Sequence, residues 1–367
     1  VNKVSEILAK EAERLYREKL RAKNIDGVYA FPHPLGCSQR GEDLASTRRA
    51  LAGLVRHPNA GGVLVLGLGC ENNDLQTFKR FLGDYDSERV RFLLLQEAAD
   101  ETDEGLELIE ELVEYASGFE RQRVPVSKLK VGVECGGSDA FSGITANPLV
   151  GMFSDMLISL GGTVILTEVP EMFGAETILM NRCKNRRVFE KTVNLINGFK
   201  EYLHSYDREL YKSPSYGNRI GGITTLDEKS LGCILKGGTG HVADVVAYGE
   251  RVTESGLNLL ESPGDDLVAT TALAAAGAQV VLFTTGRGTP MGGPVPTVKI
   301  ASTSELAERK KHWIDFNAGE LFEGTEMKKL AEDLFIYVIK VASGEALTKN
   351  EINGYREIGI FSRGVTI

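Results

Sequence analysis

Short, almost wholly apolar segments alternate with longer amphipathic ones along this chain, and this alternation limits the possible folds more than any other feature. The apolar segments have the length of strands, and strands this apolar are typical of parallel sheets that are covered on both faces. The predicted strands are residues 28–32, 62–67, 91–95, 130–134, 163–167 and 279–284. The predicted helices are residues 41–57, 73–82, 103–116, 148–160, 175–206, 267–276 and 327–343. The pattern predicts an α/β fold with mainly parallel, Rossmann-like sheets flanked by helices.

The alternation breaks once, in a polar stretch around residues 118–127. A chain of 367 residues is also longer than a single core usually supports. We therefore expect an N-terminal α/β domain over residues 1–125 and a C-terminal α/β domain over residues 126–367. The carboxyl ends of parallel strands share one edge of a sheet, so an active site is expected at those ends, between the two domains.

Charge and hydropathy exclude several kinds of partner. The formal net charge is -9, and no run of Lys and Arg is long enough to bind a nucleic acid or an anionic membrane surface. No segment has the roughly 18–20 apolar residues that cross a bilayer, and the charged N-terminus is no signal peptide. We expect a cytoplasmic homo-oligomer. Because the chain starts at Val1, without a methionine or a strand, it is expected to begin partway through a longer or processed polypeptide.

Three of the five cysteines lie where an apolar strand runs into a Gly-rich, polar loop: Cys37, Cys70 and Cys135. Each alone could be a buried structural thiol. Three thiols at equivalent strand ends could instead converge on a soft metal, zinc or an iron–sulfur cluster. No Cys-x-x-Cys pair supports that interpretation, which depends on topology alone. Cys183 is predicted to lie within a helix, and the role of Cys233 stays open.

The Gly-rich loops do not indicate a nucleotide. None has the Gly-x-Gly-x-x-Gly pattern at a first strand, and none ends in Gly-Lys-Ser/Thr. A nucleotide-dependent oxidoreductase is therefore not supported. Asn147, followed by Pro148, is predicted to cap a helix whose free N–H groups would favour a carboxylate.

Several long motifs resemble those of the altronate/galactarate dehydratase family. The longest is Cys135 to Pro148, CGGSDAFSGITANP, and others are GGITTL at residues 221–226 and TTGRGTP at residues 284–290. Further matches lie at residues 33–37, 69–72, 161–171 and 296–300, so the resemblance covers about residues 25–367. Family members carry a small N-terminal domain, sometimes as a separate subunit; this chain is expected to lack that domain, and such a subunit is an expected partner.

The resemblance implies a hydro-lyase that dehydrates a sugar acid like altronate or galactarate to a 2-keto-3-deoxy acid. A metal acting as Lewis acid would stabilise the developing enediolate and help hydroxide leave. Iron (Fe²⁺) is the expected metal, with Mn²⁺ or an iron–sulfur cluster on the three cysteines as alternatives. Two other functions stay open: the large subunit of a sulfolactate sulfo-lyase, and a substrate-binding subunit that needs a separate small domain for activity.

The resemblance and the loop positions together give a set of candidate site residues. The predicted metal ligands are Cys37, Cys70 and Cys135, with His33 as a possible fourth. The predicted substrate-binding residues are Ser138, Asp139, Thr145, Asn147, Arg287 and Lys299. Arg287 and Lys299 are the expected carboxylate clamps, because guanidinium and ammonium groups pair with carboxylates. The predicted catalytic residues are Glu168, Glu171, Lys229 and His33.

Overall fold

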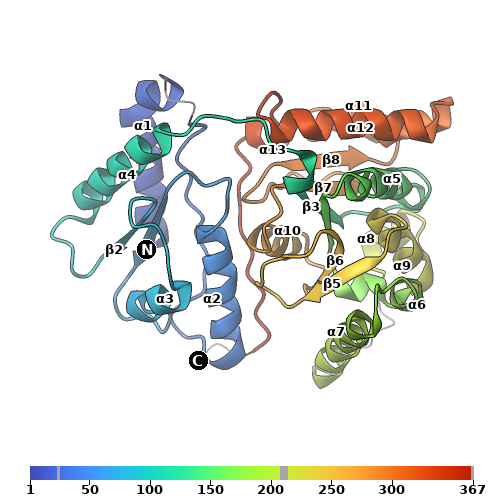
Figure 1. Cartoon of the computed structure of the whole chain (residues 1–367), viewed down its shortest axis with the longest axis horizontal. Coiled ribbons are helices and arrows are strands. Elements are labelled where there is room, and N and C mark those ends of the chain that lie inside the picture. Colours follow the sequence, from blue (N-terminus) through green and yellow to red (C-terminus); the bar gives the residue numbers. More distant parts are fainter. Residues whose placement is uncertain (23–24, 207–213, 365–367) are drawn as a thin grey trace. The chain divides into compact units, whose positions relative to one another are not determined.

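The computed structural model describes residues 1–22, 25–206 and 214–364 and divides the chain into two compact units. The first unit comprises Val1–Val124 together with the segment from Glu357 onward, and the second comprises Pro125–Arg356. Figure 1 shows helices and strands in both units. None of the described helices combines the length and the apolar character needed to cross a membrane.

The first unit is built on two parallel strands, β1 (Val63–Gly67) and β2 (Val90–Leu94). Successive side chains of β1 point to opposite faces of the sheet, and helices pack against each face. Leu64 and Leu66 pack against α1 (Asn2–Ala22) and α4 (Glu101–Ser117). Val63 and Val65 pack against α2 (Gly41–Val55) and α3 (Leu75–Leu82). Packing of helices against both faces explains why the sequence of β1 is apolar throughout, although residues 63–66 are only half-buried.

The predicted strand at residues 28–32 is wrong, because this segment is irregular. The backbone N–H of Val28 donates to Glu13 Oε1 of α1 at 2.6 Å rather than to a neighbouring strand. Pro32 and Pro34 have no N–H and cannot extend a ladder of strand hydrogen bonds. Helix α1, which precedes this segment, was not predicted as an element.

The second unit contains a seven-stranded sheet in the order β5-β6-β4-β3-β7-β8-β9, with every pair parallel. The strands are β3 (Lys130–Cys135), β4 (Thr163–Leu166), β5 (Val242–Val246), β6 (Gly256–Leu260), β7 (Val280–Thr285), β8 (Thr297–Ala301) and β9 (Phe316–Asn317). Flanking helices include α5 (Ala146–Ser159), α10 (Asp266–Ala275) and α12 (Met327–Ala342). Gly132 of β3 leaves room for Leu273 of α10, which would lie 2.9 Å from any Cβ there. The predicted parallel α/β fold is confirmed.

The centre of this sheet is a topological switch point. From β3 the chain continues to β4 on one side, whereas from β7, which is hydrogen-bonded to the other side of β3, it continues to β8. Loops that leave neighbouring strands in opposite directions open a crevice at the strands' carboxyl ends, where α/β proteins bind ligands. Cys135 is the last residue of β3 and therefore lies at this crevice.

Two helix predictions in the second unit need correction. Helix α5 begins at Ala146 with Thr145 in the N-cap position, so Asn147 is not the cap. The Asn147 amide oxygen instead accepts a hydrogen bond from the Thr284 hydroxyl at 2.7 Å.

The long helix predicted over residues 175–206 is two helices, α6 (Glu176–Met180) and α7 (Arg186–Ser205). Asn185 starts the second helix, because its side chain accepts the backbone N–H of Val188 at 3.0 Å. Cys183 lies between the helices rather than inside one, where its backbone bridges to Val242 of β5.

Candidate metal centre and substrate pocket

One helix brings three chemically active side chains to the carboxyl end of β3. Helix α9 (Leu226–Ile234) continues into the 3₁₀ turn η5 (Leu235–Gly237). Its start is fixed by a capping box, in which Thr225 and Glu228 accept each other's backbone N–H groups. Lys229, Cys233 and Lys236 follow at a spacing of four and then three residues, so they share one helical face. All three are at most 4% exposed.

Two thiols and a carboxylate meet beneath this face. Cys135 Sγ and Cys233 Sγ lie 3.4 Å apart, and both lie close to Glu171 Oε2, at 3.0 Å and 2.8 Å. The two cysteines are free thiols, since a disulfide bond would bring their sulfurs to about 2.0 Å. In the part of the chain that the structure describes, this is the one group of His, Cys, Asp and Glu atoms close enough to share a metal ion.

Lys229 links this group to the neighbouring loop. Its Nζ lies 3.0 Å from Glu171 Oε1, 2.7 Å from Ser138 Oγ and 3.5 Å from Cys135 Sγ. Burial alone would lower the pKa of Lys229, but the surrounding thiols and carboxylates raise it well above the usual value. Lys229 is therefore a buried ammonium group that holds a proton at the centre of the site.

The protonation states around the group differ strongly. The hydrogen bond with Cys233, together with burial, raises the pKa of the Cys135 thiol. Burial opposes ionisation of Glu171, but Lys229 and Lys236 outweigh it and lower the pKa of that carboxyl. A bound metal cation would reverse the shift at Cys135, because coordination deprotonates a thiol outright.

Glu168 has an unusual backbone. Its φ is +67°, which makes it the one non-glycine residue with positive φ among residues 1–22, 25–206 and 214–364. Its Oε2 accepts the backbone N–H of Cys135 at 3.0 Å and lies 3.5 Å from Lys236 Nζ. Burial, and then Cys135 and Glu171, raise the pKa of Glu168. Such conformations persist where the surroundings enforce them, and they concentrate at functional sites.

Replacing Lys236 with methionine is expected to destabilise the second unit by about 1–3 kcal/mol, because the Glu168 carboxyl, whose pKa burial already raises, would lose its partner in the interior. Both side chains are only 1% exposed, so solvent cannot compensate. Urea unfolding monitored by circular dichroism measures the loss. The double variant Lys236→Met/Glu168→Gln should recover most of it. A single-variant loss below about 1 kcal/mol, the usual value of a surface ion pair, would contradict a buried charge pair.

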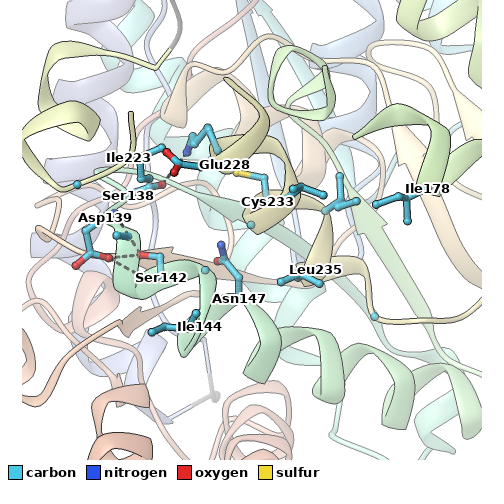
Figure 2. A pocket seen from close by; sticks show the side chains of 18 of the residues that line it. Ser138, Asp139, Ser142, Ile144, Asn147, Ile178, Ile223, Glu228, Cys233 and Leu235 are labelled. Atoms are coloured by element: carbon cyan, nitrogen blue, oxygen red, sulfur yellow. Dashed lines mark hydrogen bonds between the residues drawn. The ribbon is translucent and has the colours of Figure 1, made fainter. Parts of the chain in front are cut away.

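A pocket of about 400 Å³ lies beside the thiol–carboxylate group. Figure 2 shows Ser138 and Asp139 on one side, Ile178 on the other and Cys233 between them. Lys229 and Cys233 contribute both to the pocket wall and to the thiol–carboxylate cluster. This volume falls within the range of small-molecule sites.

Four of the predicted site residues line this pocket: Ser138, Asp139, Asn147 and Lys229. The other predicted residues of the second unit do not line it. Thr145 Oγ1 contacts the carbonyl oxygens of Phe141 and Ser302, each at 2.8 Å. Arg287 is exposed and donates to the carbonyl oxygen of Gly217 at 3.0 Å. The buried Lys299 donates to the carbonyl oxygen of Met291.

His33, Cys37 and Cys70 belong to the first unit and are not part of the Cys135 group. Their loops do meet: Asn73 N–H donates to the Gly36 carbonyl oxygen at 3.3 Å, and Asn72 Nδ2 donates to that of Gln39 at 2.9 Å. Cys37 and Cys70 are both exposed free thiols. Burial lowers the pKa of His33.

Sequence reasoning left two site residues unassigned. The sequence leaves the role of Cys233 open and does not single out Lys236. A signal was present, since Lys229, Cys233 and Lys236 have the spacing of one helical face directly after the Thr225–Glu228 capping pattern.

A parallel sheet with a thiol–carboxylate–lysine cluster at its switch point defines this protein as an α/β enzyme. The family model described as "D-galactarate/Altronate dehydratase, C-terminal" matches residues 126–366. The model described as "D-galactarate dehydratase/Altronate hydrolase, second domain" matches residues 1–117. The chain belongs to the D-galactarate/altronate dehydratase family, which confirms the resemblance.

Three relatives show how far the similarity extends. The altronate dehydratase of Escherichia coli (strain K12) is 53% identical over 354 residues, 96% of this chain and 71% of the relative. The altronate dehydratase of Bacillus subtilis (strain 168) is 53% identical over 365 residues, 99% of this chain and 73% of the relative. The galactarate dehydratase (L-threo-forming) of E. coli is 35% identical over 326 residues, 86% of this chain and 62% of the relative.

Proposed function

We propose that this protein is a hydro-lyase that dehydrates a hexonate or hexarate, altronate- or galactarate-like, to a 2-keto-3-deoxy acid. The observation that carries the proposal is the Cys135–Glu171–Cys233 group beside a pocket of about 400 Å³, in a chain of this family. We further propose that these three side chains hold Fe²⁺, which when bound supplies Lewis-acid polarisation of the substrate's oxygens.

Whether such a metal fits depends on the donor atoms of the group, which are two thiol sulfurs and a carboxylate oxygen. Thiolates favour soft or borderline metals such as Fe²⁺ and Zn²⁺, whereas Mn²⁺ prefers carboxylate, carbonyl and water oxygens. An iron–sulfur cluster is usually held by four cysteines, and this group supplies two. Three protein ligands also leave a position open for substrate, as catalytic metal sites require. The group therefore supports a single iron ion over Mn²⁺ or a cluster.

Lys229 is the proposed proton donor. Dehydration removes the C2 hydrogen as a proton, which passes to a base or to water, and the C3 hydroxyl, which leaves as water once protonated; the resulting enol tautomerises to the 2-keto acid. The leaving hydroxyl needs a proton, and the protonated amine of Lys229 lines the pocket; coordination of Glu171 to a cation would weaken the attraction that raises the pKa of Lys229. Ser138 Oγ, 2.7 Å from Lys229 Nζ, orients this group.

The remaining candidates have narrower or untested roles. Ser138, Asp139 and Asn147 line the pocket and are proposed to contact the substrate's hydroxyl groups. Glu171 is assigned to the metal, and Glu168 to holding the end of β3 through the backbone N–H of Cys135. The site roles of His33, Cys37, Cys70, Thr145, Arg287 and Lys299 remain predictions from the sequence. So do a small-domain partner subunit, a homo-oligomer and a cytoplasmic location.

The test is a metal and activity measurement on protein purified without oxygen. Iron and acid-labile sulfide are quantified, and 2-keto-3-deoxy acid formation is assayed with altronate and with galactarate. We expect bound iron without sulfide, and turnover that is lost on chelation and restored by Fe²⁺. Sulfite release from sulfolactate, with no turnover of either sugar acid, would identify a sulfo-lyase instead. Inactivity on all three substrates with iron bound would contradict a self-sufficient hydro-lyase.

A further inference from the structure

The pocket is lined by four charged side chains, and three of them are already engaged within the protein. Asp139 accepts hydrogen bonds from Ser142 through Oδ1 and from Ser302 through Oδ2. Glu228 Oε2 accepts the backbone N–H of Thr225 in the capping box. These contacts stabilise the local fold, and neither of these two acidic side chains would pair with a substrate carboxylate.

Lys229, the third of these side chains, is bound to Glu171 and Ser138, as described above. Its ammonium group therefore belongs to the metal end of the pocket. The remaining charged side chain is Arg182.

Arg182 is a half-buried cation whose guanidinium is fixed in place. Its Nε and Nη2 donate to the carbonyl oxygen of Gly240, at 2.9 Å and 2.5 Å, and Nη2 also lies 3.5 Å from that of Gly237. Nη1 donates to no acceptor within the described part of the chain. Asp155 is the nearby carboxylate that acts on Arg182, but its Oδ1 already accepts the N–H groups of Thr239 and Gly240, and its Oδ2 accepts the Thr239 hydroxyl. Arg182 thus lines the pocket, is held in place through Nε and Nη2, and keeps Nη1 uncommitted.

Arg182 and the metal group occupy different ends of the pocket. The pocket follows α9 from Lys229, in its first turn, to Leu235 and Gly238 beyond its end. With a rise of about 1.5 Å per residue, Lys229 and Leu235 are about 9 Å apart along the helix axis. Arg182 binds the carbonyl groups on either side of Gly238, which places it at the far end. Figure 2 shows the same direction, from Ser138 past Cys233 to Ile178.

We propose that Arg182 binds the end of the substrate remote from the metal and thereby determines which sugar acids are accepted. This inference deepens the proposed function and rests on it. A hexarate has a second carboxylate at that end, whereas a hexonate has a hydroxymethyl group. A guanidinium binds a carboxylate by charge-assisted hydrogen bonds, which are roughly twice as strong as neutral ones. Arg182 therefore contributes more to the binding of the dicarboxylate.

The experiment compares Arg182→Met with the wild-type, iron-loaded enzyme on galactarate and on altronate. We expect KM for galactarate to rise about 10-fold more than KM for altronate, with a smaller change in kcat, which corresponds to the loss of a hydrogen bond to a charged group. Arg182→Lys keeps the positive charge but lacks the planar guanidinium. Its ratio of KM for galactarate to KM for altronate should lie between those of the wild type and Arg182→Met. Arg186→Met, which removes an exposed arginine paired with Glu190, is the matched control and should leave both KM values unchanged.

A structural role for Arg182 predicts a different result. If the arginine only holds the turn at residues 237–240, Arg182→Met would raise both KM values by the same factor, and the inference is wrong. Equal KM values in variant and wild type would also overturn it. If wild-type enzyme turns over neither sugar acid, the proposed function has failed. The inference is then decided by calorimetry, in which Arg182→Met must weaken galactarate binding more than altronate binding. Should Arg182→Met not fold, Arg182→Lys supplies the same comparison.

Discussion

Replacing Cys233 with alanine is expected to weaken iron binding by at least about 100-fold and to abolish sugar acid dehydration. Loss of a partner outside the coordination shell already costs about 10–100-fold in metal affinity, and loss of a ligand costs more. Cys233 Sγ lies 3.4 Å from Cys135 Sγ and 2.8 Å from Glu171 Oε2, so its removal leaves two donors of the three. Metal content after dialysis against a graded series of chelators measures the change.

The controls for this prediction are other cysteines of the same chain. Cys183→Ala removes a half-buried thiol that bonds to Thr192 and lies outside the group. It should retain iron and activity. Cys37→Ala and Cys70→Ala decide between the two metal-site models. Loss of iron in these variants, with iron kept in Cys233→Ala, would support the three-cysteine site predicted from the sequence and reject the Cys135–Glu171–Cys233 site.

Replacing Lys229 with methionine is expected to lower kcat by about 10²–10⁴-fold, the usual contribution of a positioned acid or base. Methionine fills a similar volume but carries no proton. Iron should remain bound, because removing a buried positive charge beside Glu171 makes the site more favourable for a cation. Steady-state kinetics and iron analysis of the same preparation test both statements.

Lys184→Met serves as the matched control, because Lys184 is a partly exposed lysine paired with Glu254. Its kcat should equal that of the wild type. A Lys229→Met enzyme that keeps its iron and turns over within a few-fold of wild type would exclude Lys229 as the proton donor. Loss of iron together with activity would instead assign Lys229 to assembly of the metal group.

The sequence identified five strands in which apolar residues dominate, although β2 contains Arg91 and β3 contains Glu134, and it missed β5, β6, β8 and β9. β1, β2, β3, β4 and β7 were predicted, because burial on both faces makes such strands continuous apolar runs. β6 contains the buried Asn258, whose amide bonds to the carbonyl oxygens of Glu254 and Gly256. β8 contains Lys299, and β9 has two residues. These strands form because they pair with strands distant in the sequence, and a local sequence pattern does not reveal such pairing.

The sequence predicts most of the individual residues of the site but not which of them come together in space. Cys135, Glu171 and Lys229 were all named, because each lies in a polar segment with a family motif. Their assembly brings Cys135 to Glu171 and Cys233, which are 36 and 98 positions away in the sequence. Cys37 and Cys70 looked equivalent to Cys135 because each follows an apolar stretch. The stretch before Cys37 is no strand, however, and neither thiol lies in the second unit.

Helix α9 and the turn after it set the spacing of Lys229, Cys233 and Lys236. The site should therefore tolerate substitutions on the outer surface of this helix better than insertions or deletions within it. Asp227 of this helix is exposed and does not line the pocket, so substitution or attachment of a reporter group there leaves the inward face intact. Inserting one residue between Lys229 and Cys233 would turn one relative to the other by about 100° around the axis, because a turn takes about 3.6 residues. Homologues that vary freely in surface chemistry along this helix should therefore keep its residue count from Thr225 to Lys236 constant.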